Sequence, residues 1–128
     1  MARARSLVAV QLLALVAVKA DDEPVDLELA SGTVRGKLGG GRVQTFLGVP
    51  FAQPPVGARR WQPPLQEQPW AGVKQATSYS HSCMQTGGFG KLSGISEDCL
   101  YLNAWLPAAG NSTPPPPEGG YAVMLFFY

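Results

Sequence analysis

The residues with the most obvious potential for chemistry are two adjacent carboxylates and a single histidine. Glu97 and Asp98 directly precede Cys99, and His81 stands between two serines. Neighbouring residues of an extended segment point to opposite sides, so the two carboxylates cannot flank one bond as paired acid and base. No Gly-x-Ser-x-Gly turn is present to expose a serine. We therefore interpret His81 as a polar loop residue and none of the serines as a nucleophile.

The N-terminus has the pattern of a secretory signal peptide. Arg3 and Arg5 form a basic start, residues 7–18 are apolar apart from one glutamine, and Ala20 is the small residue that cleavage needs. About twelve apolar residues span roughly 18 Å as a helix, which is too short for a bilayer core. We expect residues 1–20 to be a signal-peptide helix and the protein to be secreted or in the endoplasmic-reticulum lumen, with no transmembrane segment.

The net charge limits which binding partners are plausible, and the two cysteines fit an oxidising compartment. Removing residues 1–20 takes three basic side chains away and leaves seven against nine acidic ones, so the net charge changes from +1 to −2. No basic patch remains for nucleic acid. In a secreted chain, Cys83 and Cys99 favour a disulfide over a metal site, because His81 is the only histidine and the spacing fits no zinc pattern. A loop of about 15 residues closed in this way contributes roughly 3 kcal/mol.

Four segments have the period-two alternation of β-strands. Residues 25–29 and 33–37 flank a glycine-containing turn and predict a hairpin, and residues 42–47 return after three consecutive glycines. Residues 100–106 alternate in the same way directly after the acidic segment. A further apolar run, residues 122–128, reads as an interior strand because it is apolar on both faces.

A proline-rich segment, residues 48–69, separates these strands. Its prolines exclude a helix or a central strand. Six apolar side chains in it could pin it to a core, each contributing about 1.5–3 kcal/mol when buried. These are Val49, Phe51, Val56, Trp61, Leu65 and Trp70 at its border.

Three motifs together resemble the N-terminal region of type-B carboxylesterases, the α/β-hydrolase family that includes liver-type carboxylesterases, bile-salt-activated lipase and the cholinesterases. They are residues 46–57 (FLGVPFAQPPVG), Arg60-Trp61, and residues 96–103 (SEDCLYLN). The similarity covers about residues 29–128. It implies an α/β fold class, of which residues 21–128 would be an incomplete N-terminal part made mostly of strands and proline-rich loops.

The resemblance also implies roles for individual residues. Cys83 and Cys99 match the cysteines of the family's first disulfide loop, which lies beside the mouth of the active-site gorge. Arg60 and Glu97 match a structural ion pair, which we expect to be buried because acidic residues next to an apolar strand are otherwise costly. Truncating Arg60 in a full-length protein should then cost about 3–5 kcal/mol.

The resemblance implies no catalytic residue and no metal or other cofactor within the chain. In the family, the strand matching residues 123–127 leads into the oxyanion-hole loop, and Tyr128 matches the residue that introduces that loop. The oxyanion glycines, the nucleophile, the acid and the histidine would all follow Tyr128. We expect an inactive N-terminal part of a serine esterase whose full-length form cleaves ester or lipid-like substrates.

Two alternatives stay open. A non-catalytic adhesion domain of the neuroligin kind shares the Glu-Asp-Cys-Leu-Tyr-Leu-Asn motif, although the short interval between Cys83 and Cys99 leans toward an esterase. Asn111-Ser112-Thr113 is an acceptor for N-glycosylation, but Pro114 directly after it leaves transfer open. Substrate and oligomeric state are not encoded in these residues.

Overall fold

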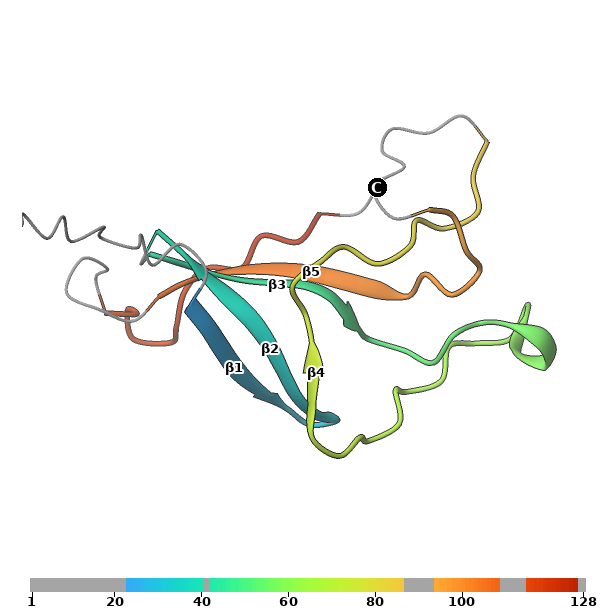
Figure 1. Ribbon diagram of the computed structural model, residues 1–128, viewed down its shortest axis with the longest axis horizontal. Coiled ribbons are helices and arrows are strands. Elements are labelled where there is room, and N and C mark those ends of the chain that lie inside the picture. The colour runs from blue at the N-terminus through green and yellow to red at the C-terminus, as the bar shows by residue number, and fades with distance from the viewer. Residues whose placement is uncertain (1–22, 41, 87–93, 109–114, 127–128) are drawn as a thin grey trace, which may run out of the picture.

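The computed structural model describes residues 23–40, 42–86, 94–108 and 115–126 (Figure 1). Five strands and one short 3₁₀ helix lie in these ranges. The elements are β1 (Glu23–Leu29), β2 (Gly32–Gly39), β3 (Val43–Pro50), η1 (Gly57–Arg59), β4 (Val73–Gln75) and β5 (Tyr101–Pro107). The described part is therefore mostly β-strand, as expected for part of a carboxylesterase-type domain, and the expected signal-peptide helix lies outside it. None of its helices is long and apolar enough to cross a membrane.

The five strands form one twisted sheet. β1, β2, β3 and β5 follow one another as antiparallel neighbours, with the two-residue turn Ala30-Ser31 joining the first pair. β4 is the exception, because it pairs parallel to β2 at residues 33–35, while β3 pairs with β2 at residues 37–39. β3 and β4 thus share one edge of β2, and the sheet forks there (Figure 1).

The core forms between residues of β2, β3 and the segment directly after β4. Val34, Phe46, Val49 and Ala76 are buried, and apolar residues of β1 and β5 pack against them. Gly36 is required at this point because a Cβ atom there would collide with the Thr45 carbonyl oxygen and with the Phe46 ring. The alternation that predicted the strands is therefore the alternation between the core and the solvent.

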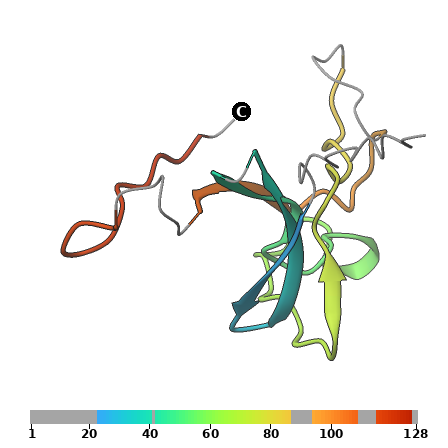
Figure 2. The same cartoon turned by 60° about the vertical axis from the view of Figure 1, so that its left-hand side comes forward.

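The predicted strand at residues 122–128 does not form within its described part. Residues 121–126 have no regular structure and lie beside the sheet rather than in it (Figure 2). Val123, Met124 and Leu125 are 89%, 94% and 73% exposed. A strand that is apolar on both faces needs a neighbouring strand to pair with and packed layers over both of its faces. Among the described residues, neither is present around residues 121–126.

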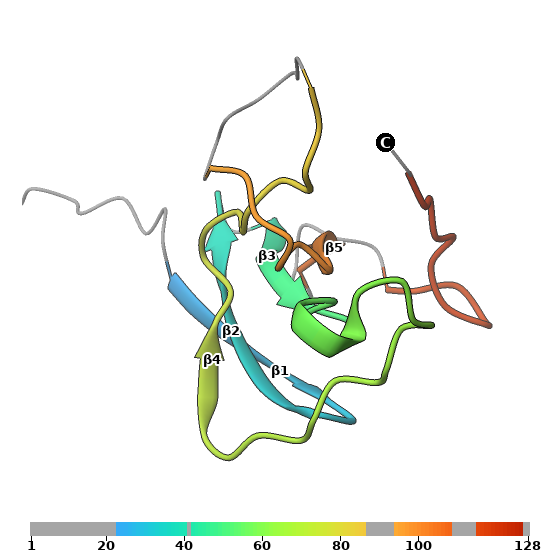
Figure 3. The same cartoon turned by 90° about the vertical axis from the view of Figure 1, so that its right-hand side faces the viewer.

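The proline-rich segment is also less buried than expected. Val49 belongs to the core and Trp70 packs against it, but Phe51, Trp61 and Leu65 are exposed. Residues 51–66, which we call the proline loop, extend away from the sheet and carry η1 near their tip (Figures 1 and 3). The prediction that apolar side chains pin this segment to a core is therefore confirmed for Val49 and Trp70. It is wrong for Phe51, Val56, Trp61 and Leu65, because the sheet does not reach them.

Candidate functional site

The segment before β5 carries the residues that the sequence singled out. The disulfide between Cys83 and Cys99 forms, with the two Cα atoms 5.1 Å apart. On the same two limbs, the backbone N–H of Ser82 donates to Gly94 O at 3.0 Å, and the N–H of Ser96 donates to Ser82 O at 3.0 Å. The disulfide loop is therefore tied at its base by both covalent and backbone bonds, and the sequence-based pairing is confirmed.

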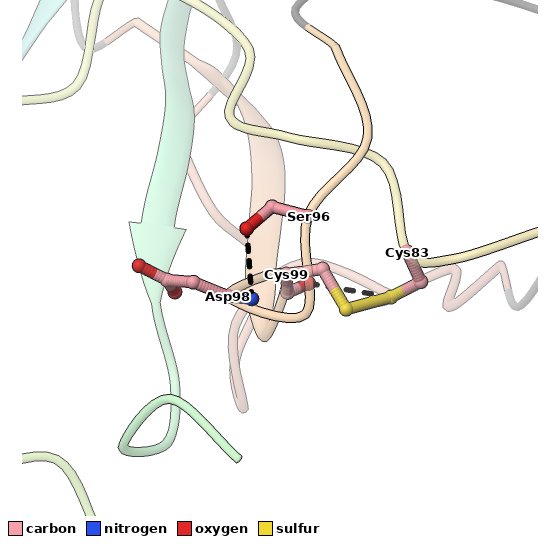
Figure 4. Close-up of a disulfide and its surroundings, with 4 residues drawn as sticks. All are labelled: Cys83, Ser96, Asp98 and Cys99. Atoms are coloured by element: carbon pink, nitrogen blue, oxygen red, sulfur yellow. Dashed lines mark hydrogen bonds between the residues drawn. A yellow bond between two sulfur atoms is a disulfide. The ribbon is translucent and has the colours of Figure 1, made fainter. Parts of the chain in front are cut away.

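Asp98 has a structural environment rather than an acid–base one. Its backbone N–H donates to Ser96 Oγ at 3.1 Å, which turns the chain just before β5 (Figure 4). In Figure 4 its side chain points away from the disulfide. The carboxylate oxygen Oδ1 is buried and has no hydrogen-bond partner among the described residues. A buried acceptor of this kind is costly, so the other contacts of Asp98 matter for stability.

Tyr101, the first residue of β5, is that contact. Burial raises the pKa of its phenol, and a hydrogen bond to Asp98 together with the Asp98 charge raises the pKa further. A hydrogen bond from Ser80 acts in the opposite direction, and the charge of Glu67 adds a small increase to the pKa. Tyr101 therefore stays protonated well into alkaline pH and can donate to Asp98. Ser80 takes part in this network, which gives it a role other than that of a nucleophile.

Arg60 and Glu97 are brought together, with Nη2 and Oε1 2.9 Å apart. Their side chains are 52% and 39% exposed, so the pair is not buried in the described chain. The physical reason is the position of Arg60 near the tip of the proline loop, which extends into solvent. An exposed pair contributes at most about 1 kcal/mol, well below the value expected for a buried one. The expectation of a buried pair concerned a full-length protein and stays a prediction.

Asn103 has a function in the fold that sequence reasoning missed. Its Oδ1 accepts the backbone N–H of Gly48 at 2.9 Å. Gly48 sits at a bulge in β3, between Phe46 and Val49, with φ +72°, and a Cβ atom there would come within 2.8 Å of Ser78 O. Asn103 thus satisfies a donor that the bulge removes from the ladder. An asparagine within an alternating strand was the available signal.

A cavity of about 430 Å³ lies between the end of β3, β4 and the start of β5. The residues with polar side chains in its lining are Glu67, Lys74, Gln75 and Tyr101. Lys74 Nζ lies 3.2 Å from Glu67 Oε1 and 4.0 Å from the centre of the Trp70 ring, so its charge is already matched by these two partners. Among the described residues that line the cavity there is no serine or histidine, so they offer no serine nucleophile with a histidine base.

The remaining residues that the sequence singled out are His81, Asn111 and Tyr128, together with possible metal ligands. Within the described ranges, no three or more His, Cys, Asp or Glu residues gather as a metal site would require. The ring of His81 lies near Gly94, at the base of the disulfide loop. Asn111 and Tyr128, the expected glycosylation and oxyanion-loop positions, lie outside the described residues. The site as described can position loops against a sheet, but it assembles no reacting groups.

Comparisons with known proteins point in one direction. The sequence profile described as "Carboxylesterase family" matches residues 21–128. Fumonisin B1 esterase of Sphingopyxis macrogoltabida is 39% identical over 116 residues, covering 88% of this chain and 20% of that protein. Carboxylesterase 4A of Bos taurus is 38% identical over 112 residues, covering 75% of this chain and 19% of that protein. The chain thus spans about a fifth of the length of these relatives.

Proposed function

Since the chain belongs to the carboxylesterase family, we propose that it is the N-terminal part of a secreted serine carboxylic-ester hydrolase. Residues 1–20 are the signal peptide in this proposal, and residues 21–128 are the first part of the catalytic domain. The observation that carries it is the family match over the whole of residues 21–128 by a chain that spans 20% and 19% of its relatives. Both relatives carry esterase names, which supports an esterase over an adhesion domain.

The role proposed for this part is structural. The disulfide, the Asp98–Tyr101 contact and the Gly48–Asn103 bond all fix loops onto the β3–β5 pair. The nucleophile, its base and the oxyanion glycines belong to the remainder of the domain in this proposal. An enzyme without nucleophile and base loses most of its rate enhancement, so the chain alone should not turn over esters.

Two experiments on one substrate test this proposal. Purified residues 21–128 should hydrolyse p-nitrophenyl acetate no faster than a buffer blank. A chimera in which these residues replace the matching region of fumonisin B1 esterase should hydrolyse both the nitrophenyl ester and fumonisin B1. Turnover by the isolated chain, or chimeras that do not fold in either that host or bovine carboxylesterase 4A, would contradict the proposal.

Two local assignments belong to the same proposal. Asn111 carries an N-glycan, and Tyr128 introduces the oxyanion-hole loop of the complete domain. A mass shift on treatment with a peptide N-glycosidase, absent in Asn111→Gln, tests the first in secreted material. For the second, Tyr128→Ala in the chimera should lower kcat for the nitrophenyl ester; an unchanged kcat would remove that role.

A further inference from the structure

The proline loop presents a large apolar surface to solvent. Trp61 is 94% exposed, Leu65 53%, Phe51 52% and Val56 37%. Exposed apolar side chains gathered on one loop indicate an interaction surface when the loop is held in place. Figure 1 shows the loop and its 3₁₀ turn extending away from the sheet.

The loop is held in a defined shape. The Gln53 N–H donates to Leu65 O at 2.9 Å, and its side-chain amide donates to Gln66 O at 2.9 Å, so the two limbs are joined at the neck. At the tip, Arg60 is bonded to Glu97, which ties the loop to the disulfide segment. A surface that is already ordered loses little conformational entropy when it binds.

Trp61 itself has an unusual conformation. Its φ of +62° lies in the left-handed region, and it is the one non-glycine residue with positive φ among the described residues. Such conformations persist where their surroundings demand them and often serve function. Here the left-handed residue directs the most exposed aromatic side chain of the described chain into solvent.

We infer that the proline loop, with Trp61 as its anchor, is the docking surface for the remainder of the carboxylesterase domain. This inference rests on the proposed function. Its support is the length of polypeptide involved, because the chain covers only 20% and 19% of its relatives, and the remaining length of such a protein would supply the surface that covers the loop. Tryptophan is one of the residue types enriched among the anchors of interfaces.

The charges of the loop define the complementary surface. Arg60 is neutralised by Glu97, so the charge that the tip presents beside Trp61 is that of Arg59. Arg59 is exposed and donates one hydrogen bond, of 3.4 Å, to Pro54 O. The docking partner is therefore a polypeptide surface that is apolar opposite Trp61 and Leu65 and supplies a carboxylate or carbonyl acceptor for Arg59.

The chimera with fumonisin B1 esterase separates this inference from the proposed function. Activity of the unmodified chimera tests the function, and Trp61→Gln and Leu65→Gln in it test the docking surface. We expect each variant to lower the yield of active, protease-resistant chimera by about tenfold or more, as loss of an interface anchor does. The control Val73→Thr changes an exposed apolar residue outside the loop and should leave the yield unchanged.

Quenching of tryptophan fluorescence by acrylamide supplies a measurement that does not depend on yield. The fraction of emission that Trp61→Gln removes should be readily quenched in isolated residues 21–128 and protected in the chimera. An active chimera in which Trp61 stays accessible, or in which neither loop variant has an effect, overturns the inference and leaves the proposed function standing. Concentration-dependent dimerisation of the isolated chain, or its binding to anionic lipid vesicles, also overturns it if Trp61→Gln abolishes that association.

Discussion

The ion pair between Arg60 and Glu97 contributes little to the free energy of unfolding. The two side chains meet at 2.9 Å but remain about half exposed. Water screens their attraction, and holding two long side chains in one geometry costs entropy. Their value to the fold is the position of the loop tip rather than a large contribution to the free energy of unfolding.

A double-mutant cycle measures that contribution. Arg60→Met, Glu97→Gln and the double variant of residues 21–128 should give a coupling free energy below about 1 kcal/mol by urea denaturation. The coupling should shrink further in high salt, because both groups are exposed. A coupling near 3 kcal/mol that salt does not change would instead indicate a desolvated pair.

Tyr101 makes the stability depend on pH on the alkaline side. Burial and Asp98 raise its pKa in the folded state above the ordinary value of 10.0. The unfolded chain therefore loses this proton first, and the stabilisation is complete below about pH 10 and lost as the pH rises through the folded-state pKa. Wild-type protein should lose stability above pH 10 more steeply than Tyr101→Phe in urea titrations.

Two variants identify the cause of that slope. Asp98→Asn removes the charge and should reduce the alkaline slope while Tyr101 remains. Tyr101→Phe should also cost about 1 kcal/mol at pH 7, since the Asp98 carboxylate, which already has an unsatisfied oxygen, loses a donor. Equal slopes in all three proteins would rule out Tyr101 as the titrating group.

At the scale of elements, the bulge in β3 is the most demanding local feature. Gly48→Ala forces a Cβ atom to within 2.8 Å of Ser78 O at a φ of +72°. Gly40→Ala is the matched control, since its φ is +55° and nothing lies within 4 Å. We expect Gly40→Ala to cost about 1 kcal/mol and Gly48→Ala about 2–4 kcal/mol, because only the second adds a collision to the backbone cost. Equal losses in thermal unfolding would show that the bulge relaxes.

The elements that could be predicted from the sequence are those with a clear alternation of apolar and polar residues along their own length. Alternation and turn glycines located β1, β2, β3 and β5 to within a few residues. β4 was missed because three residues, Val73 to Gln75, carry no periodicity, and their strand conformation comes from pairing with β2. Residues 122–126 were overpredicted for the opposite reason: their β-propensity is high, but a strand also needs partners.

In the candidate site, too, some contacts could be predicted from the sequence and others depend on the tertiary arrangement. The disulfide followed from residue types and compartment, and the meeting of Arg60 and Glu97 was anticipated through the family resemblance. Exposure of that pair could not be predicted, since it depends on how far the proline loop projects. The contacts of Tyr101 with Asp98 and of Asn103 with Gly48 join positions whose proximity arises from the β3–β5 register.

For the whole molecule, the exposed run of residues 123–126 should govern solubility. Its four apolar residues have high β-propensity and no charge, which favours edge-to-edge association. Met124→Lys together with Leu125→Lys should lower the aggregation rate of residues 21–128, measured by light scattering, without changing the urea midpoint. Two lysines at exposed polar positions, Gln62→Lys and Gln85→Lys, control for net charge; an equal benefit there would assign the effect to charge alone.

The fork at β2 also sets an order of folding events. β1, β2 and β3 are consecutive and joined by short turns, so their pairing needs little loop closure, whereas β4 and β5 must reach the sheet from far along the chain. In pulse-labelling hydrogen exchange, the amide protons of the β1–β2 ladder should become protected first. The amide protons of Ala76, which donates to Arg35 O, and of Leu47, which donates to Ala76 O, should become protected later. As a nascent chain leaves the ribosome, β1, β2 and β3 can therefore pair first, and one edge of β2 and of β3 stays unpaired until β4 and β5 have been synthesised.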